Sequence, residues 1–215
     1  MKKAIILLAV VGILFNFIAF FFLPDKVPLH FNLQGQPDRF GSKIAFSSIY
    51  GGVYLFILVL YLIIPAIDPK RRLTLSQKGY NRIIFSLLIA FLIFNLLHFL
   101  AGRSKDLKVG LFNAALGILF ILVGNYLPTI KPNYFVGIRT PWTLENEKVW
   151  KKTHRLGGWV FTLGGIIIAL SALTPGKIRS WIMVLVIAFM AIVPLLYSYL
   201  YWAKKVKPQN QDQTG

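Results

Sequence analysis

Histidine and arginine side chains are the groups best suited to chemistry in this sequence of 215 residues, which contains three histidines and no cysteine. His30 and Asp38 lie in one polar segment where they could meet, yet two exposed polar residues do not form an active site. The sequence lacks the HExxH, GxSxG and P-loop motifs, and without cysteine it has no thiolate ligand or cysteine nucleophile. We therefore predict that the protein is not an enzyme, with no catalytic residue, no metal site and no cofactor.

Arg139 is the candidate for binding a charged group. It precedes Pro141 and Trp142 in a polar segment between two apolar ones. A guanidinium in such a position can hold a carboxylate or a phosphate through two parallel hydrogen bonds. Glu147 is the internal candidate partner. If the two residues pair, the segment is a locked scaffold, and if Arg139 is free, it is a docking point. We favour the scaffold.

The elements that must position these residues are six apolar segments. Hydrophobic residues make up 56% of the sequence and charged residues 14%, against about 45–50% and 25% in soluble domains, which excludes an ordinary globular enzyme. Each segment has the length of roughly twenty residues that crosses a hydrocarbon layer. We predict an all-α membrane protein with six transmembrane helices, at 4–23, 44–65, 83–101, 109–127, 156–173 and 181–202.

The basic residues predict the orientation. Lys and Arg number 24 against 7 Asp and Glu, a net charge of +17, and they lie between the apolar segments, where they indicate topology and contact with anionic headgroups of the lipid bilayer. A cytoplasmic N-terminus places 16 basic residues inside and 8 outside. We therefore predict a multi-pass cell-membrane protein with both termini cytoplasmic. Because the basic residues are spread over several loops, we predict no direct nucleic-acid binding.

The long polar loops divide the chain into two halves and a tail. The predicted parts are an N-terminal half with three spans and an outer loop, a second half with three spans and an inner motif loop, and a disordered cytoplasmic tail. Their bounds are 1–108 with the outer loop at 24–43, 109–203 with the inner loop at 128–155, and 204–215.

A shift of 104 residues aligns landmarks of the two halves, placing Leu23-Pro24 on Leu127-Pro128 and Pro28 on Pro132. Because three spans is an odd number, such a repeat would insert the halves in opposite orientations, as a 3+3 inverted repeat. The alternative is coincidence among prolines, which commonly lie at helix ends.

Polar residues inside the predicted spans are few, namely Asn16, Asn95, His98, Asn113 and Asn125. Buried asparagine usually bonds one membrane helix to another, and we predict that role here. His98 is expected at the outer interface. No acidic or basic residue lies deep in a span, which argues against a proton-coupled pump.

The inner loop has strong local signals. Pro132 and Pro141 forbid a continuous helix, and Gly137 can supply a positive φ. Thr140 before Pro141 fits a helix N-cap followed by proline at the first helical position, with Thr143 as a rival cap.

From this cap to Arg155 we predict a short helix at the membrane interface, because tryptophans occur in it together with basic residues. They are Trp142, Trp150, Lys148, Lys151, Lys152 and Arg155. Glu147 and Lys151, and likewise Trp150 and His154, have the i,i+4 spacing of neighbours on a helix.

The inner loop resembles the signature of the SdpI family, and the outer loop resembles an N-terminal domain of unknown function often found with it. The matching inner residues are Gly124-Asn125, Asn133-Tyr-Phe-Val-Gly137-Ile-Arg139-Thr140-Pro141-Trp142-Thr143-Leu144, Glu147, Trp150, Thr153, His154-Arg155 and Gly157. The matching outer residues are Pro24, Val27-Pro28, His30-Phe31-Asn32, Gly35, Pro37-Asp38 and Gly41-Ser42-Lys43.

The resemblance implies a multi-pass bacterial membrane protein that protects its cell from a secreted peptide toxin, and that can hold a cytoplasmic transcriptional repressor at the membrane. A small membrane transporter or exporter of a peptide or lipid-like substrate is the alternative. As candidate contacts for a peptide in the outer loop we predict Pro28, His30, Phe31 and Asp38. As motif residues that bind a partner or form a scaffold we predict Asn125, Asn133, Gly137, Arg139, Thr140, Pro141, Trp142, Thr143, Glu147, Trp150, His154 and Arg155.

Overall fold

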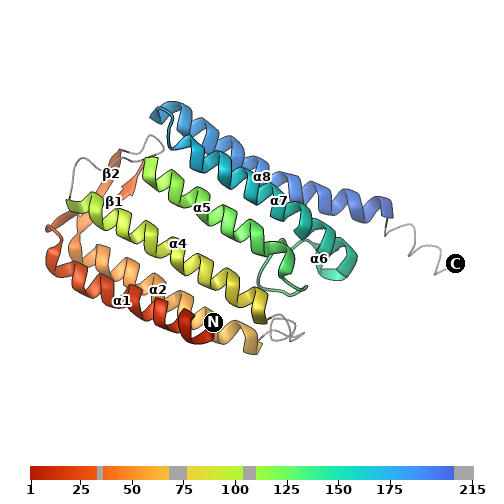
Figure 1. The fold of residues 1–215 in the computed structure, drawn as a ribbon, viewed down its shortest axis with the longest axis horizontal. Helices are drawn as coiled ribbons and strands as arrows, with labels where there is room; N and C mark the ends of the chain where they lie inside the picture. Colours follow the sequence, from red (N-terminus) through yellow and green to blue (C-terminus); the bar gives the residue numbers. More distant parts are fainter. Residues whose placement is uncertain (33–35, 68–76, 104–109, 206–215) are drawn as a thin grey trace.

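Six long helices dominate the computed structural model, which describes residues 1–32, 36–67, 77–103 and 110–205. All six are long and apolar enough to cross a membrane, as predicted. They are α1 (Lys2–Phe22), α2 (Lys43–Ile67), α4 (Gln77–Arg103), α5 (Gly110–Tyr126), α7 (Glu147–Ser171) and α8 (Gly176–Lys205) (Figure 1). The predicted tail overlaps the last helix at Lys204 and Lys205, and its remainder lies outside the described residues.

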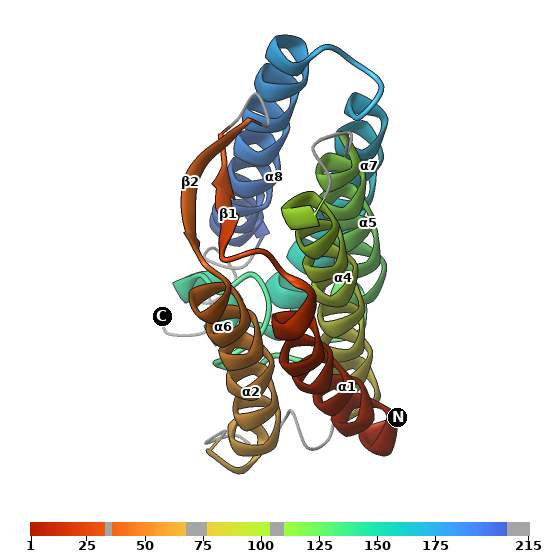
Figure 2. The ribbon, with the colours of Figure 1, turned by 90° about the vertical axis from the view of Figure 1, so that its left-hand side faces the viewer.

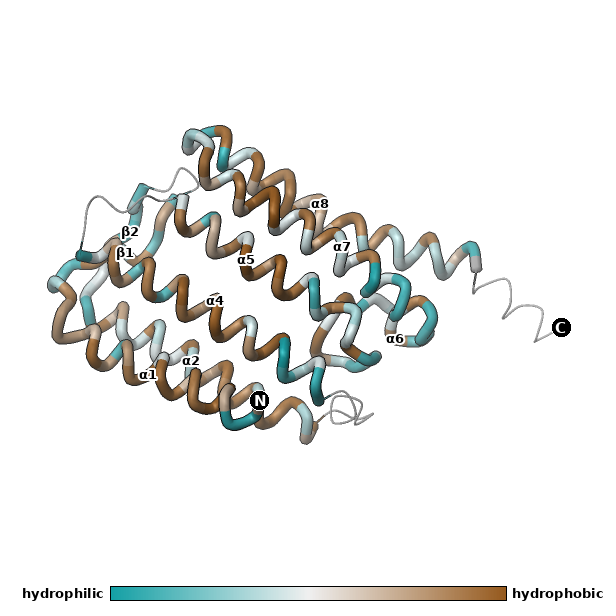
Figure 3. Tube along the Cα trace, viewed as in Figure 1, coloured by the Kyte–Doolittle hydropathy of each residue, from teal (hydrophilic) through white to brown (hydrophobic). Residues whose placement is uncertain are grey.

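The helices are apolar along most of their length (Figure 3), and many of their large apolar side chains are exposed. Phe17 of α1, Leu55 of α2 and Leu185 of α8 are all more than half exposed. In a soluble protein such surfaces would aggregate, whereas in a bilayer they face lipid. Helices suit this setting because each satisfies its own backbone hydrogen bonds.

The helices pack as a row with two flanking members. Along the row, α1 contacts α4, α4 contacts α5, and α5 contacts α7. Seen from one end, α2 and α8 lie on the same side of this row and apart from each other, with α4 and α5 in the middle (Figure 2). The central pair α4–α5 therefore joins the two halves of the chain.

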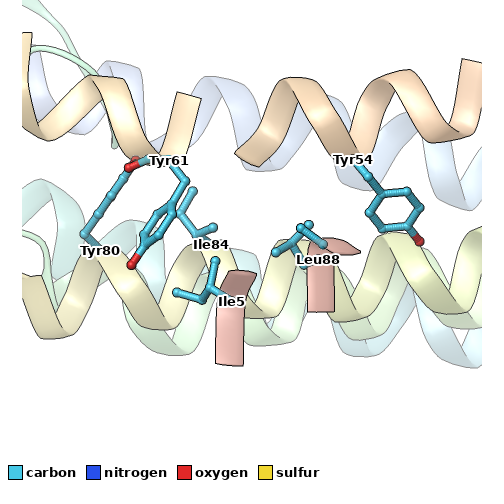
Figure 4. Close-up of a cluster of buried hydrophobic side chains, with 7 residues drawn as sticks. Ile5, Tyr54, Tyr61, Tyr80, Ile84 and Leu88 are labelled. Atoms are coloured by element: carbon cyan, nitrogen blue, oxygen red, sulfur yellow. The ribbon is translucent and has the colours of Figure 1, made fainter. Parts of the chain in front are cut away.

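Tyrosines fill much of the core of the first half. The buried cluster draws on α1, α2 and α4 and contains Ile5, Tyr54, Tyr61, Tyr80, Ile84 and Leu88 (Figure 4). The rings of Tyr61 and Tyr80 stack with their centroids 5.6 Å apart. Farther along, Asn95 Nδ2 donates to Asn16 Oδ1 at 3.1 Å, which confirms the predicted bond between helices for this pair. The same prediction is wrong for Asn125, which is exposed.

Glycines let α5 and α7 approach closely in the second half. A Cβ on Gly117 would lie 2.5 Å from the carbonyl oxygen of Gly165, and one on Gly124 would lie 2.7 Å from that of Gly158. Side chains at these positions would force the backbones apart. Small residues at a helix crossing are the usual basis of tight packing in membranes.

The two halves pack differently. In the first half, α1 contacts both α2 and α4, and in the second half the middle helix of the chain order, α7, contacts both α5 and α8. The aligned prolines also differ in setting, since Pro24 precedes a strand and Pro128 lies in a 3-10 turn, η1 (Leu127–Thr129). The repeat therefore rests on sequence spacing alone.

A β-hairpin follows α1, which the prediction of an all-α protein did not include. Its strands β1 (Lys26–Phe31) and β2 (Pro37–Ser42) pair antiparallel. Prolines argue against central strands, but both strands of a hairpin are edges, where proline is tolerated. The pairing is irregular next to Pro28, so its missing N–H is accommodated at a bulge.

Candidate functional site at the two ends of the bundle

The hairpin lies at one end of the bundle and the inner-loop motif at the other, and α1 begins and α8 ends toward the end that carries the motif (Figure 1). We refer to these as the hairpin end and the motif end. The hairpin is closed at its base by Asp25 and Lys43, whose charged atoms are 2.9 Å apart. Near its tip, His30 Nδ1 and Asp38 Oδ1 are 2.6 Å apart and both residues are exposed, as the sequence suggested.

His98 of α4 binds the hairpin to the helices. Its Nε2 lies 3.0 Å from the carbonyl oxygen of Pro28, and its Nδ1 is bonded to the hydroxyl of Tyr50 on α2. A carbonyl only accepts, so Nε2 carries the proton and Nδ1 accepts from the tyrosine. His98 is only 4% exposed and occupies a packed junction of three elements near the end of α4, and its position at the outer membrane interface stays a prediction.

A cavity of about 390 Å³ lies beneath the hairpin, between the two halves of the chain. Phe31 forms part of its wall, with its ring 5.0 Å from that of Phe112 on α5. Hairpin residues 29–32 meet α2, α4, α5 and α8 there, and the helical lining residues are Tyr50, Phe94, His98, Phe112, Asn113, Leu116 and Met183.

At the motif end, Asn133 folds the loop around its own side chain. Its Oδ1 accepts from the backbone nitrogens of Phe135 at 2.8 Å and Val136 at 2.7 Å. Its Nδ2 donates to the carbonyls of Lys131 at 2.9 Å and Val136 at 3.0 Å. The hydrogen bonds of this buried side-chain amide all lie within the loop and stabilise a turn.

His154 and Trp150 clamp the next part of the motif. Their rings stack with centroids 4.0 Å apart, as the i,i+4 spacing predicted. His154 Nε2 accepts from Ile138 N at 3.1 Å, and its Nδ1 lies 2.9 Å from the Trp150 carbonyl. Gly137 has a φ of 120°, as predicted, and a Cβ there would lie 2.4 Å from His154 Nε2. Both histidine nitrogens are used within the protein.

Thr140 and Thr143 form a capping box at the start of α6 (Pro141–Glu145), with Pro141 in its first turn. Thr140 is thus the N-cap, as predicted, and Thr143 its reciprocal partner rather than a rival. The hydroxyl of Thr140 also contacts that of Ser198 on α8 at 3.2 Å. Trp142 packs on Tyr199 of α8, with ring centroids 5.0 Å apart, so α6 is anchored to the last helix.

Two predictions for the motif are wrong. Arg139 donates to the backbone carbonyl of Tyr134, whereas Glu147 lies 3.4 Å from Lys151, so the favoured Arg139–Glu147 pair is absent. The predicted short helix also does not continue to Arg155. Asn146 ends α6 and caps α7, which makes residues 147–155 the first turns of the fifth span.

The predicted motif residues therefore separate into two sets. The set that holds the loop is buried or half-buried and comprises Asn133, Gly137, Thr140, Trp142, Thr143, Trp150 and His154. The exposed set comprises Asn125, Arg139, Pro141, Glu147 and Arg155. Of the predicted contacts in the hairpin, His30 and Asp38 are exposed, Phe31 is half-buried and Pro28 is buried.

The cavity was missed because its lining comes from spans far apart in the sequence. One signal was present in the first half, since Tyr50, Tyr54 and Tyr61 recur at a spacing that places them on one face of α2. All of them are buried. Tyrosines repeated on one face of a span indicate a face turned toward protein.

Six membrane-length helices, a hairpin at one end and a locked loop at the other define a multi-pass helical membrane protein. The sequence model of the SdpI/YfhL protein family matches residues 129–198, and that of a domain of unknown function (DUF1648) matches residues 7–64. The chain is 28% identical over 206 residues to the immunity protein SdpI of Bacillus subtilis (strain 168), covering 95% of this chain and 98% of that protein. No solved structure matches. The chain therefore contains a region that matches the SdpI/YfhL family, preceded by a region that matches the DUF1648 domain.

Proposed function

We propose that this chain is an integral membrane immunity protein, which gives its cell resistance to a secreted, membrane-active peptide toxin. The observation that carries the proposal is the similarity to immunity protein SdpI over 95% of the chain, because it includes both the hairpin end and the motif end. The six membrane-length helices support the proposal, because a membrane-active peptide acts on the bilayer that such helices cross.

In this proposal the hairpin end faces the outside of a bacterial cell, and the motif end and both termini face the cytoplasm. The exposed cations Lys148, Lys152 and Arg155 at the motif end support this orientation. The peptide contacts the outward surface of the hairpin around His30 and Asp38.

The inward side of the hairpin transmits the contact. Pro28 is hydrogen-bonded to His98 of α4, and Phe31 packs on Phe112 of α5, so a shift of the hairpin changes the packing between the two halves. A peptide shifts such an equilibrium only as far as it binds one packing more tightly than the other.

At the motif end, the exposed set is the proposed docking surface for a cytoplasmic transcriptional repressor. Arg139 and Glu147 are not paired with each other, so both charged groups can face a partner. The buried set keeps the loop in one conformation while the residues of the exposed set bind or release the repressor.

Protection from killing tests the proposal. Cells that express the chain are challenged with the peptides encoded beside its gene, and survival should exceed that of cells without it. The double substitution His30→Ala, Asp38→Ala should reduce protection at unchanged abundance, whereas Asp25→Asn, which removes the ion pair at the hairpin base, should retain it. Equal killing of both strains by every such peptide, at proven expression, would contradict the proposal.

A small transporter or exporter of a peptide or lipid-like substrate is the second candidate. It is favoured by the cavity of about 390 Å³ between the two halves, which is where a substrate site of a two-half transporter is expected. Uptake of a labelled peptide or lipid by vesicles that contain the purified protein would support transport over passive binding.

A further inference from the structure

A second pocket continues the cavity beneath the hairpin toward the middle of the bundle. It measures about 190 Å³ and shares Phe94 and Leu116 with the first cavity. The pocket lies on the face of the α4–α5 pair, and its other lining residues are Ile57, Leu87, Ala90, Phe91, Ala115 and Leu119. Most of these side chains are half-buried, so the pocket also opens to the outside of the bundle, where the bilayer lies. The two spaces are adjacent because they share part of their lining, and we call them together the α4–α5 groove.

The inner part of the groove is too narrow for a helix and too apolar for an extended peptide. An apolar cavity of about 150 Å³ binds a benzene molecule, so about 190 Å³ admits a chain or a single ring. A helix with its side chains is roughly 10–12 Å across. An extended peptide would bury N–H and C=O groups, and no side chain that lines the inner pocket can bond them. A hydrocarbon chain is narrow enough for the inner pocket and has no polar group that needs a hydrogen-bond partner there.

The outer part of the groove suits a polar and negatively charged head. Asn113 reaches only the sulfur of Met183, at 3.7 Å, among the described residues, and His30 and Asn32 complete a polar rim. Arg39 is paired in register with His30, is exposed, and forms no ion pair within the described part of the chain. Asp25 and Asp38 already have partners in Lys43 and His30, so Arg39 leaves an uncompensated positive charge on the strand next to this rim.

We propose that the α4–α5 groove binds one acyl chain of an anionic membrane lipid, with the chain between α4 and α5 and the head beneath the hairpin. The lipid enters from the bilayer through the open side of the groove. The bound chain would separate the two halves of the protein along α4 and α5. The proposed lipid site does not depend on the immunity function.

A photoreactive lipid tests the proposal. The purified full chain is placed in nanodiscs of phosphatidylcholine with a minor fraction of phosphatidylglycerol that carries a diazirine midway along one acyl chain. After illumination, mass spectrometry should locate adducts on Leu87–Phe94 and Ala115–Leu119, and excess unlabelled phosphatidylglycerol should suppress them. The same probe with a phosphatidylcholine head should label these residues less.

Variants that fill the inner pocket supply the control. Ala115→Phe and the milder Leu119→Trp should lower labelling of the groove by about fivefold or more, because overpacking competes with the chain. Ile118→Phe enlarges an exposed side chain on the same helix and should leave labelling unchanged. Thermal unfolding of each variant verifies the fold.

Three outcomes would overturn the proposal. The first is labelling of the groove that excess lipid does not suppress, or that the filling variants leave unchanged in a folded protein. The second is equal labelling by the probes with the two headgroups, which would show that the groove does not prefer an anionic lipid. The third is labelling of these residues by a diazirine-bearing hydrophobic peptide that lipid does not displace, which would assign the groove to a peptide.

Discussion

The ring of His98 donates to the carbonyl oxygen of Pro28 across 3.0 Å, and this bond ties the hairpin to the third span. The carbonyl lies in a strand, the imidazole in α4, and the hydroxyl of Tyr50 on α2 completes the chain of bonds. Since Pro28 and His98 are buried, the first strand of the hairpin is packed against the helices rather than forming a free loop.

Removing the tyrosine hydroxyl from this junction should destabilise the protein. Tyr50→Phe keeps the ring contacts but leaves the buried Nδ1 of His98 without its donor, a loss of about 1–3 kcal/mol. Tyr199→Phe is the matched control, because Tyr199 is 46% exposed and contacts Trp142 through its ring. Unfolding in detergent measures both variants. Equal midpoints for Tyr50→Phe and the unmodified protein would mean that the bond contributes nothing to the fold.

Gly137→Ala should destabilise the motif end by more than 1 kcal/mol. The backbone at Gly137 has a φ of 120°, and an added Cβ would meet His154 Nε2 at 2.4 Å, so the change combines backbone strain with a clash. Gly52→Ala is the control, because a Cβ at Gly52 meets nothing within 4 Å and alanine favours a helix by about 1 kcal/mol. The two variants should shift the unfolding midpoint in opposite directions, and a shared direction would contradict this reading of Gly137.

Local features of this chain could be predicted from its sequence, and contacts between distant segments could not. Each span is a run of apolar residues, and the cap at Thr140 depends on residues within three positions. Both features can therefore be predicted from residues that are close in the sequence. The bonds of His98 join residues 48 and 70 positions apart. Their formation depends on how α2 and α4 pack, which apolar composition does not specify.

The Arg139–Glu147 pair failed for a different and local reason. Sequence spacing placed two opposite charges near each other, but the start of α7 at Glu147 sets its carboxylate one turn from Lys151. Arg139 instead turns back to the Tyr134 carbonyl. Where α7 begins was decided by Asn146, whose side chain accepts from the nitrogens of Lys148 and Val149.

The proposed orientation can be measured with single cysteines, because the natural chain contains none. Gln36→Cys lies in the hairpin and Lys148→Cys at the motif end, and both native residues are exposed. On intact cells, a membrane-impermeant maleimide should modify Gln36→Cys and spare Lys148→Cys, and permeabilised cells should show both modified. Modification of Lys148→Cys from outside would reverse the topology and remove the proposed cytoplasmic docking surface.

The division of the motif into buried and exposed sets predicts that substitutions in the two sets have different effects on stability. Asn133→Ala removes four hydrogen bonds inside the loop and should destabilise the protein by several kcal/mol, because buried backbone groups lose their partners. Arg139→Gln removes an exposed charge and should change the free energy of unfolding by only about 0.5 kcal/mol.

The effect of the two substitutions on repressor recruitment should have the opposite order to their effect on stability, when recruitment is measured per amount of folded protein. Arg139→Gln should lose repressor recruitment at normal abundance, measured by co-purification from membranes, whereas Asn133→Ala should lose it only in proportion to the folded protein that remains. Asn125→Ala, an exposed asparagine of the same motif, controls for loss of an amide without loss of the turn. If Arg139→Gln destabilised the chain as much as Asn133→Ala, the guanidinium would have a structural role in the loop, and Arg139 would no longer be a candidate contact of the docking surface.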